Sequence, residues 1–116
     1  MIEIEIREFL DHSGRSLFGR WFNDLNAAAA ARVTIALTRL GHGNFSNVEG
    51  VGSGVYELKI DFGPGYRVYF GKDGERIVIL LGGSSKKRQR AAIAAAQEAW
   101  LDYKRRRVSE EGGRWH

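Results

Sequence analysis

Residues 55–81, VYELKIDFGPGYRVYFGKDGERIVILL, decide the fold, because they contain three apolar-rich segments separated by two turn signals. Apolar and polar residues alternate over residues 56–62 and again over residues 66–70. Such alternation is typical of strands with one buried face. The Asp73-Gly74 dipeptide suits a tight hairpin turn, which requires positive φ. This stretch therefore predicts an antiparallel meander of three strands.

The register of the meander follows from the rule that directly opposite residues of an antiparallel pair share a face. A two-residue turn at the Asp-Gly dipeptide pairs Phe70 with Ile77. A three-residue loop at residues 63–65, which contain the one proline of the chain, pairs Phe62 with Tyr66. This register sends the apolar residues of the last two strands to one core, namely Tyr66, Val68, Phe70, Ile77, Ile79 and Leu81.

The same register gathers polar side chains on the other side of the sheet. It places Lys59 opposite Tyr69, and it places Asp61 opposite Arg67. A lysine, an arginine and a tyrosine therefore share one sheet face, and this group is the strongest functional lead in the sequence.

Length and composition favour one globular domain. The chain has 116 residues, of which 43% are hydrophobic, and this is enough for a substantial core. It has no cysteine, so the sequence offers neither a disulfide nor a thiolate metal site. The N-terminus lacks a basic region followed by an apolar run, and no stretch approaches the length of a membrane span. We therefore expect a cytoplasmic protein with no membrane partner.

The positive charge is concentrated in the second half of the chain. Residues 1–58 contain five arginines and seven acidic residues, a net charge of −2. Residues 59–116 contain thirteen lysines or arginines and seven acidic residues, a net charge of +6. The second half is therefore suited to attract a polyanion such as RNA.

The segments before the meander predict one strand and two helices. Residues 2–6, IEIEI, alternate strictly and predict a first strand. Ser13 or Ser16 is placed to cap a helix, and Asn26 to cap a second helix that ends at Gly41. Helices this close in sequence predict an antiparallel hairpin on one sheet face. Their apolar stripes contain Leu17, Phe18, Trp21 and Leu25, then Ala29 or Ala30, Val33, Leu37 and Leu40.

The segments around the meander complete the expected sheet and add a last helix. Val48 and Val51, in a glycine-rich connection, predict a short strand. Ser84 or Ser85 suits the N-cap of a helix after the meander. The buried stripe of that helix is expected to contain Ile93, Ala96, Trp100 and Tyr103.

These elements predict a single α+β domain. We expect a twisted antiparallel sheet with an N-terminal helical hairpin and a C-terminal helix over residues 1–105. Residues 106–116 are expected to form a flexible basic and polar tail.

The histidines do not suggest a metal site. His12, His42 and His116 fall in expected loops or at the terminus, without HxH or HxxxH spacing. The chain also lacks the nucleophile-elbow motif of serine hydrolases. We therefore expect neither a metal nor a cofactor.

Two carboxylates lie in the first strand of the meander. Glu57 and Asp61 have the residue type of a catalytic acid and base pair. They also suit a structural role, in which they offset Arg67 and Lys59 across the strands. We favour the structural role.

The basic cluster suits phosphodiester chemistry. RNA cleavage needs a base for the 2′-OH proton, charge to stabilise the phosphorane, and an acid for the 5′-oxygen. Lysine with a depressed pKa serves as a base, arginine clamps phosphate, and tyrosine stacks or donates. Lys59, Arg67, Tyr69 and Lys86 are the candidate catalytic residues. A solvated basic face without catalysis accounts for the same residues and remains the alternative.

A second group of cations occupies the start of the last helix. Lys87, Arg88 and Arg90 lie there beside Lys86, where cations oppose the helix dipole. Because stability alone does not favour this placement, Lys87, Arg88 and Arg90 are candidates for binding RNA.

The order strand, helix, helix, meander, helix, with GxGVxELxIxxGPGYRVYF at its centre, resembles the RelE/ParE toxin superfamily. The likeness covers residues 13–103 and is strongest to the HigB-like branch of addiction module killer proteins. The matching positions include Trp21, Leu25, Arg32, Arg39, Leu40, Asn44, Phe45, Gly54, Glu57, residues 63–70, Lys86 and Gln89.

The resemblance implies a RelE-like fold and a toxin of a type II toxin–antitoxin pair. Many such toxins enter the ribosomal A site, cleave mRNA without a metal, and arrest growth. Carried onto matching positions, Arg67 holds the scissile phosphate, Lys59 takes the place of an Arg or Lys, and Tyr69 lies near the cut nucleotide. Lys86 matches the family's lysine after the glycine pair.

The resemblance also implies a partner. It is a helix-turn-helix antitoxin of the HigA type, through which the complex contacts operator DNA. We expect this antitoxin to neutralise the basic half of the chain with acidic side chains or with a helix laid over the sheet.

The sequence departs from the family pattern after the meander. Residues 82–86, GGSSK, replace the Gly-Gly-Asp-Lys that is frequent in the family, and no histidine occupies an active position. Proton transfer is therefore unassigned. ParE-like relatives inhibit DNA gyrase on the same fold, so a gyrase-binding toxin and an inactive antitoxin partner remain alternatives.

Overall fold

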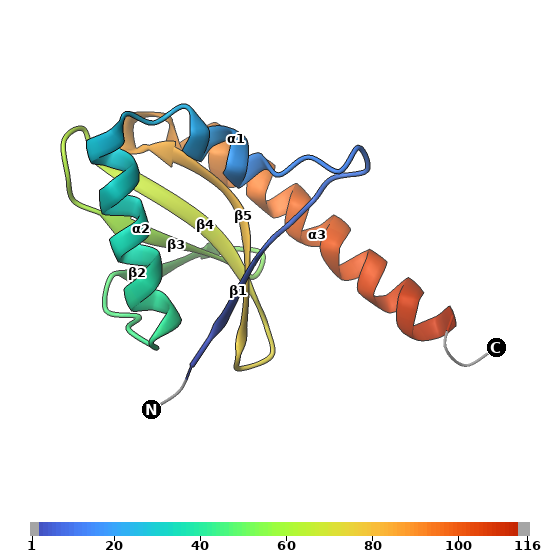
Figure 1. The fold of residues 1–116 in the computed structure, drawn as a ribbon. Coiled ribbons are helices and arrows are strands. Elements are labelled where there is room, and N and C mark those ends of the chain that lie inside the picture. The colour runs from blue at the N-terminus through green and yellow to red at the C-terminus, as the bar shows by residue number, and fades with distance from the viewer. Residues whose placement is uncertain (1–2, 114–116) are drawn as a thin grey trace.

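The computed structural model describes residues 3–113, with side chains described up to residue 109. These residues form a five-stranded sheet in the order β1-β5-β4-β3-β2, with helices on both faces (Figure 1). β1 is parallel to β5, and the other neighbours are antiparallel. The elements are β1 (Glu5–Glu8), α1 (Leu17–Asn23), α2 (Ala27–Gly41), β2 (Val48–Gly52), β3 (Val55–Ile60), β4 (Tyr66–Asp73), β5 (Ile77–Ser85), the 3₁₀ turn η1 (Lys86–Arg88) and α3 (Gln89–Gly113).

This architecture confirms the expected α+β class, with a meander, two N-terminal helices and a C-terminal helix. The predicted caps of the first two helices are also confirmed, because Ser16 accepts a hydrogen bond from Gly19 N and Asn26 accepts one from Ala29 N. Of the predicted first strand, residue 2 lies outside the described residues, and β1 begins at Glu5.

The β3–β4 connection is longer than predicted. Ile60 pairs with Tyr66 across five residues, 61–65, so the predicted pairing of Phe62 with Tyr66 is wrong. The chain turns on itself directly after Ile60, because Phe62 N donates to Ile60 O and Gly65 N donates to Phe62 O. The loop length stays odd, so the predicted faces of both strands are preserved.

In the β4–β5 hairpin, the side chains of β5 point to the opposite sheet face from the one predicted. Asp73 pairs with Ile77 across a three-residue turn, 74–76, in which Gly74 has a φ of +74°. The predicted pairing of Phe70 with Ile77 is therefore wrong, and Phe70 pairs with Leu80. An odd turn reverses the faces of β5 relative to an even one. Three residues assigned to a common core with β4 instead face α3, namely Ile77, Ile79 and Leu81.

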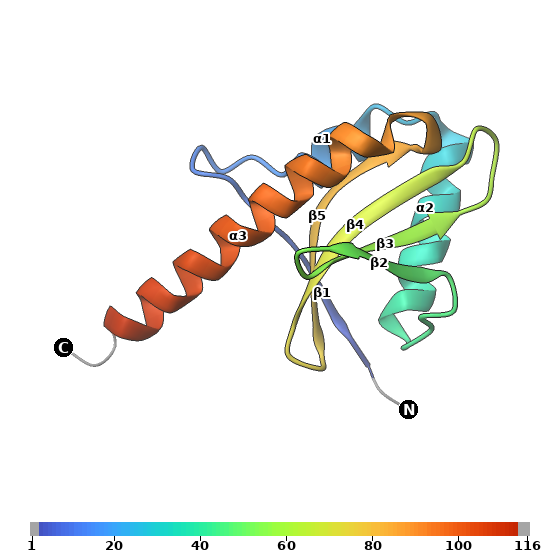
Figure 2. The ribbon, with the colours of Figure 1, turned by 180° about the vertical axis from the view of Figure 1, so that it is seen from behind.

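The sheet consequently has an apolar core on each face. The core under α1 and α2 contains Phe18, Ala29, Val33, Leu40, Leu58, Ile60, Tyr66, Val68, Phe70, Val78 and Leu80. The core under α3 contains Phe9, Val55, Tyr69, Ile79, Leu81, Ala96, Ala99 and Trp100. Figure 2 shows α3 crossing the second face and continuing beyond the edge of the sheet.

Two glycines allow tryptophans to lie directly on the strands. A Cβ at Gly71 would meet the Trp100 ring at 2.4 Å, and a Cβ at Gly83 would meet the Trp21 ring at 2.2 Å. Real side chains do not approach this closely. The two tryptophans therefore pack on opposite faces only because these strand positions are glycine.

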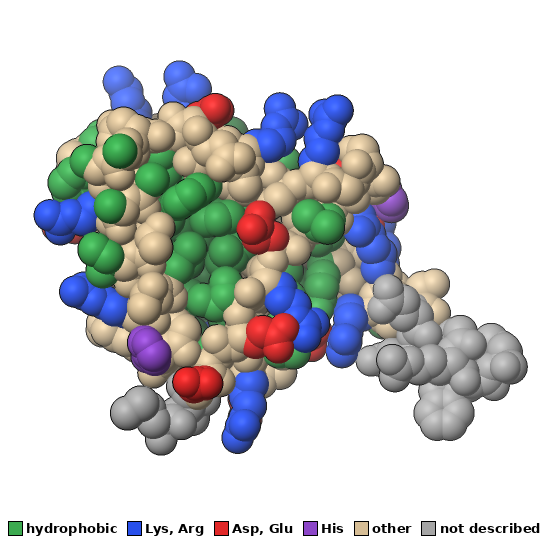
Figure 3. Space-filling model, viewed as in Figure 1, with side chains coloured by type: hydrophobic (Ala, Val, Ile, Leu, Met, Phe, Trp, Pro, Cys, Tyr) green, Lys and Arg blue, Asp and Glu red, His purple; other side chains and the backbone are tan. Residues whose placement is uncertain are grey.

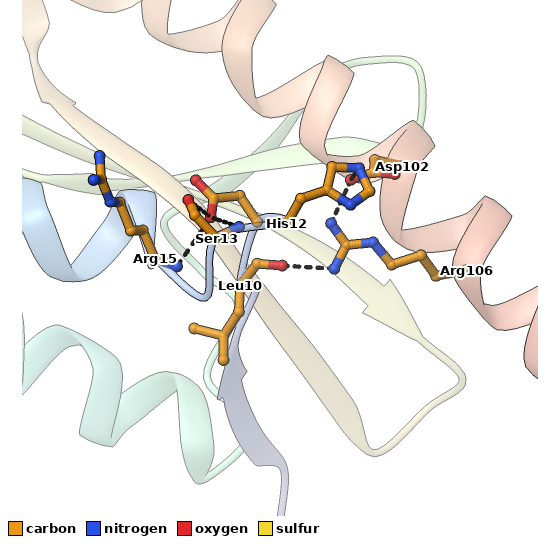
Figure 4. Close-up of polar contacts among 7 residues, drawn as sticks. Leu10, His12, Ser13, Arg15, Asp102 and Arg106 are labelled. Carbon is orange, nitrogen blue, oxygen red and sulfur yellow. Dashed lines mark hydrogen bonds and ion pairs between the residues drawn. The ribbon is translucent and has the colours of Figure 1, made fainter.

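α3 is tied to the loop after β1 by polar contacts (Figure 4). Arg106 donates to Leu10 O at 2.7 Å and to the Asp102 carboxylate at 2.6 Å. The His12 ring lies 3.7 Å from the same carboxylate. These contacts attach α3 to the loop as far as Arg106, the first residue of the expected tail. Residues 106–113 are helical, and residues 114–116 of the expected tail lie outside the described residues.

The face that carries α2 also exposes apolar surface. Hydrophobic side chains gather in the middle of this face, and basic side chains lie around its margin (Figure 3). A shallow groove there is lined by Ile4 and by Ile6 of β1, and by Phe18, Phe22 and Leu37 from the helices. In the described part of the chain, no helix is both long and apolar enough to cross a membrane.

Candidate functional site

The candidate site lies at the end of the sheet where β3 stops and β4 begins. Lys59 is directly opposite Arg67, and Arg67 is directly opposite Ser84 on β5. Lys86 N donates to Gly65 O at 2.9 Å, which brings η1 against the β3–β4 loop. The structure therefore gathers the three predicted cations at one end of the sheet.

Gly65 makes this close approach possible. Its φ is +82°, and a Cβ there would lie 3.3 Å from Lys86 Cβ and 3.9 Å from Arg67 Nη1. A side chain at this position would therefore crowd both cations, in a backbone conformation that favours glycine.

The predicted cross-strand partners differ in detail. Lys59 was expected opposite Tyr69, and Asp61 opposite Arg67; both expectations are wrong. The longer β3–β4 loop shifts the register by two residues, so Glu57 is the residue opposite Tyr69. Because the shift is even, Lys59 and Arg67 still share a face.

Arg67 is nearly buried and held on two sides. Its side chain is 11% exposed, its Nη1 donates to Tyr66 O at 3.1 Å, and its Nε lies 3.5 Å from Glu57 Oε1. The carboxylate of Glu57 is also nearly buried, and neither Arg67 Nε nor Glu57 Oε1 makes a hydrogen bond. Glu57 therefore neutralises Arg67, as the structural role predicted.

Lys59 lies on the exposed side of the site. Its Nζ donates to Glu49 on β2 at 2.5 Å. This hydrogen bond and the lysine charge lower the pKa of the Glu49 carboxyl. Asp61 was expected to offset Lys59, but Glu49 does so instead, because β2 pairs with β3 alongside it. Sequence reasoning missed Glu49, whose only signal was its place in the predicted short strand.

Tyr69 is a buried residue next to the site. The residue is fully buried, and its hydroxyl lies 3.0 Å from Ser84 Oγ. Ser84 Oγ also lies 2.9 Å from Ser85 O, so this hydroxyl is hydrogen-bonded on two sides. Burial raises the pKa of the Tyr69 phenol, and the Ser84 hydrogen bond opposes that rise. The buried ring offers no surface on which a nucleotide could stack.

The second basic group lies next to the first. Lys86, Lys87 and Arg88 form η1, and Arg90 follows in the first turn of α3; all four side chains are exposed. Ser85 occupies the N-cap position before them, but its side chain makes no capping hydrogen bond. Within the described residues, no three His, Asp or Glu side chains are grouped to hold a metal ion.

The sequence is similar to that of a known protein family and of one relative. Residues 20–104 match the family described as "Phage derived protein Gp49-like (DUF891)". A relative from Haemophilus influenzae, described as "Uncharacterized protein", is 41% identical over 64 residues. That match covers 54% of this chain and 65% of the relative, so the chain spans slightly less than two thirds of the relative's length. The chain belongs to the Gp49-like family, a toxin-type family that resembles RelE and HigB.

Proposed function

We propose that this protein is the toxin of a type II toxin–antitoxin system and that it cleaves mRNA on the ribosome. One observation carries the proposal. In a chain of a toxin-type family, Lys59, Arg67 and Lys86 converge at one end of the sheet beside a run of exposed cations.

Arg67 is the residue best placed to bind the scissile phosphate. Glu57 forms an ion pair with the guanidinium on its Nε side, and Nη1 donates a hydrogen bond to the Tyr66 carbonyl. The group is therefore oriented before RNA binds. A preorganised cation stabilises developing charge more strongly than a mobile one. We therefore assign Arg67 Nη2 to the phosphate oxygens of the transition state.

The lysines complete the chemistry. The RNA 2′-oxygen attacks phosphorus and loses its proton, while the bond to the 5′-oxygen breaks and that oxygen gains a proton. Lys59 and Lys86 are the candidates for this proton exchange and for charge stabilisation. Tyr69 acts indirectly, because its hydroxyl fixes Ser84 opposite Arg67. Lys87, Arg88 and Arg90 bind the RNA or ribosome backbone.

The partner in this proposal is a helix-turn-helix antitoxin of the HigA type, which contacts operator DNA itself. In the described residues helices of the chain already cover part of both sheet faces, which favours acidic antitoxin side chains over a helix laid across the sheet. Acidic side chains that cover the basic end of the sheet are the arrangement we propose.

Primer extension in cells tests the proposal. Induction of the wild-type protein should create new mRNA 5′ ends within translated codons, and Arg67→Ala should remove them. Arg76→Ala is the matched control, because Arg76 is an exposed arginine in the turn at the opposite end of β4 and β5. It should cleave like the wild type.

Loss of Arg67 leaves Glu57 buried without its partner, so the fold needs its own control. The double variant Glu57→Leu with Arg67→Met removes both charges and should fold without cleaving. Growth arrest with intact mRNA and broken DNA would contradict the proposal and favour a gyrase-binding toxin. Absence of any toxicity would favour an inactive antitoxin partner.

A further inference from the structure

A cavity of about 550 Å³ lies beside the candidate site. Its walls come from three places: Trp21 and Asp24 at the end of α1, Tyr66 and Ser85 on the strands, and Arg88 with the start of α3. This volume is within the range of small-molecule pockets.

The cavity exists because the edge of β5 is left open there. β1 pairs with β5 only as far as Leu80, and α1 lies beside the rest of the strand. Trp21 can lie flat on the strand because residue 83 is glycine. The Trp21 and Tyr66 rings meet at a centroid distance of 6.2 Å and an angle of 61°, so they form two adjoining aromatic walls.

The walls and the rim favour a planar ring attached to a phosphate. Aromatic faces and small alanine side chains accept a flat, apolar surface. Arg88 lines the cavity, and Lys86 and Lys87 precede it in η1; all three side chains are exposed and attract an anion. Ser85 stands at an N-cap position without capping, so its hydroxyl is not committed to the helix.

We propose that this cavity binds the base of an RNA nucleotide adjacent to the phosphate held by Arg67. The inference rests on the proposed function and names a subsite for it. Ser84 connects the two sites, because it lines the cavity and is directly opposite Arg67 on the sheet. The Asp24 carboxylate lines the cavity and only accepts hydrogen bonds, so the subsite favours a base edge that presents an N–H donor to it.

The test uses the purified full chain and 2′-O-methyl RNA hexanucleotides, which bind but are not cleaved. An abasic residue is placed at each position in turn, and affinity is measured by fluorescence anisotropy at low salt. At one position, loss of the base should weaken wild-type binding about tenfold, as base stacking on aromatic side chains does.

Two substitutions of exposed alanines on α3 form the matched pair. Ala91 lines the cavity, so Ala91→Phe should fill it and remove the dependence on that base. Ala95 is also exposed and lies one turn further along the helix, so Ala95→Phe should retain the dependence. Neither change removes a core side chain, and circular dichroism of each variant is the check that it folds.

Equal affinity for intact and abasic RNA at every position would overturn the subsite, as would unchanged base dependence in Ala91→Phe. Either result beside new mRNA ends in cells would leave the cleavage proposal standing. Base-dependent binding without new ends in cells would instead retain the subsite and overturn cleavage.

Discussion

At the scale of single residues, the site depends on the Glu57–Arg67 pair. Both side chains are nearly buried, and their closest charged atoms, Arg67 Nε and Glu57 Oε1, are 3.5 Å apart. A buried charge without its partner is strongly destabilising, whereas replacing both partners with apolar groups is often neutral. The pair thus holds Arg67 in place at little net gain in stability.

Glu57→Leu should lower the free energy of unfolding by about 3 kcal/mol, because it leaves the nearly buried Arg67 guanidinium without a charged partner. The double variant Glu57→Leu with Arg67→Met should regain most of that loss. Urea denaturation of the single and double variants measures both values. Equal losses in the single and double variants would show that the charges do not interact.

At the scale of elements, α3 is held on the sheet by packing and by polar contacts at the β4–β5 turn. Trp100 lies on Gly71, and the Tyr103 hydroxyl donates to the Asp73 carboxylate. The Trp100 and Tyr103 rings also stack, with centroids 5.2 Å apart. Substitutions at these contacts therefore test whether α3 is part of the folded core.

Gly71→Ala should destabilise the protein by about 1–3 kcal/mol, because the new Cβ would overlap the Trp100 ring. Gly82→Ala is the matched control on β5, since nothing lies within 4 Å of the Cβ it would add. Thermal unfolding of the two variants should separate them clearly. Similar melting temperatures would mean that Trp100 does not rest on β4 in solution.

Tyr103 should make stability fall at alkaline pH. Burial, the hydrogen bond to Asp73 and the Asp73 charge raise the pKa of its phenol from 10.0 to about 12. Between these values the unfolded chain loses the proton and the folded chain keeps it, so the free energy of unfolding decreases as pH rises. Tyr103→Phe should show a smaller decrease over this range in urea titrations. An identical decrease in the variant would remove Tyr103 as the cause.

At the scale of the whole molecule, alternation in residues 55–81 was sufficient to predict the meander. Side-chain periodicity also placed Lys59 and Arg67 on one face, because an error of two residues in a loop preserves faces. The same reasoning failed for β5, where a turn one residue longer moved Ile77 and Ile79 to the other core. Turn length has a weak signal in sequence, since an Asp-Gly pair fits turns of two or three residues.

The site was predictable only in part, because the sequence does not show which side chains other elements cover. Residue type and motif identify Arg67 and Lys86, but they do not predict which residues of the site are buried. Periodicity placed Tyr69 on a polar face, yet α3 covers that face and removes the ring from solvent. Glu49 was missed because its role depends on the pairing of β2 with β3.

The most direct test of the central claim is single-turnover cleavage of mRNA on purified, programmed ribosomes. The wild-type protein should cut within the A-site codon, and Arg76→Ala should cut at the same rate. Arg67→Ala should be slower by about 10²–10³-fold, as when one preorganised transition-state donor is removed. Equal rates for wild type and Arg67→Ala, or no cleavage by the wild type, would contradict the account.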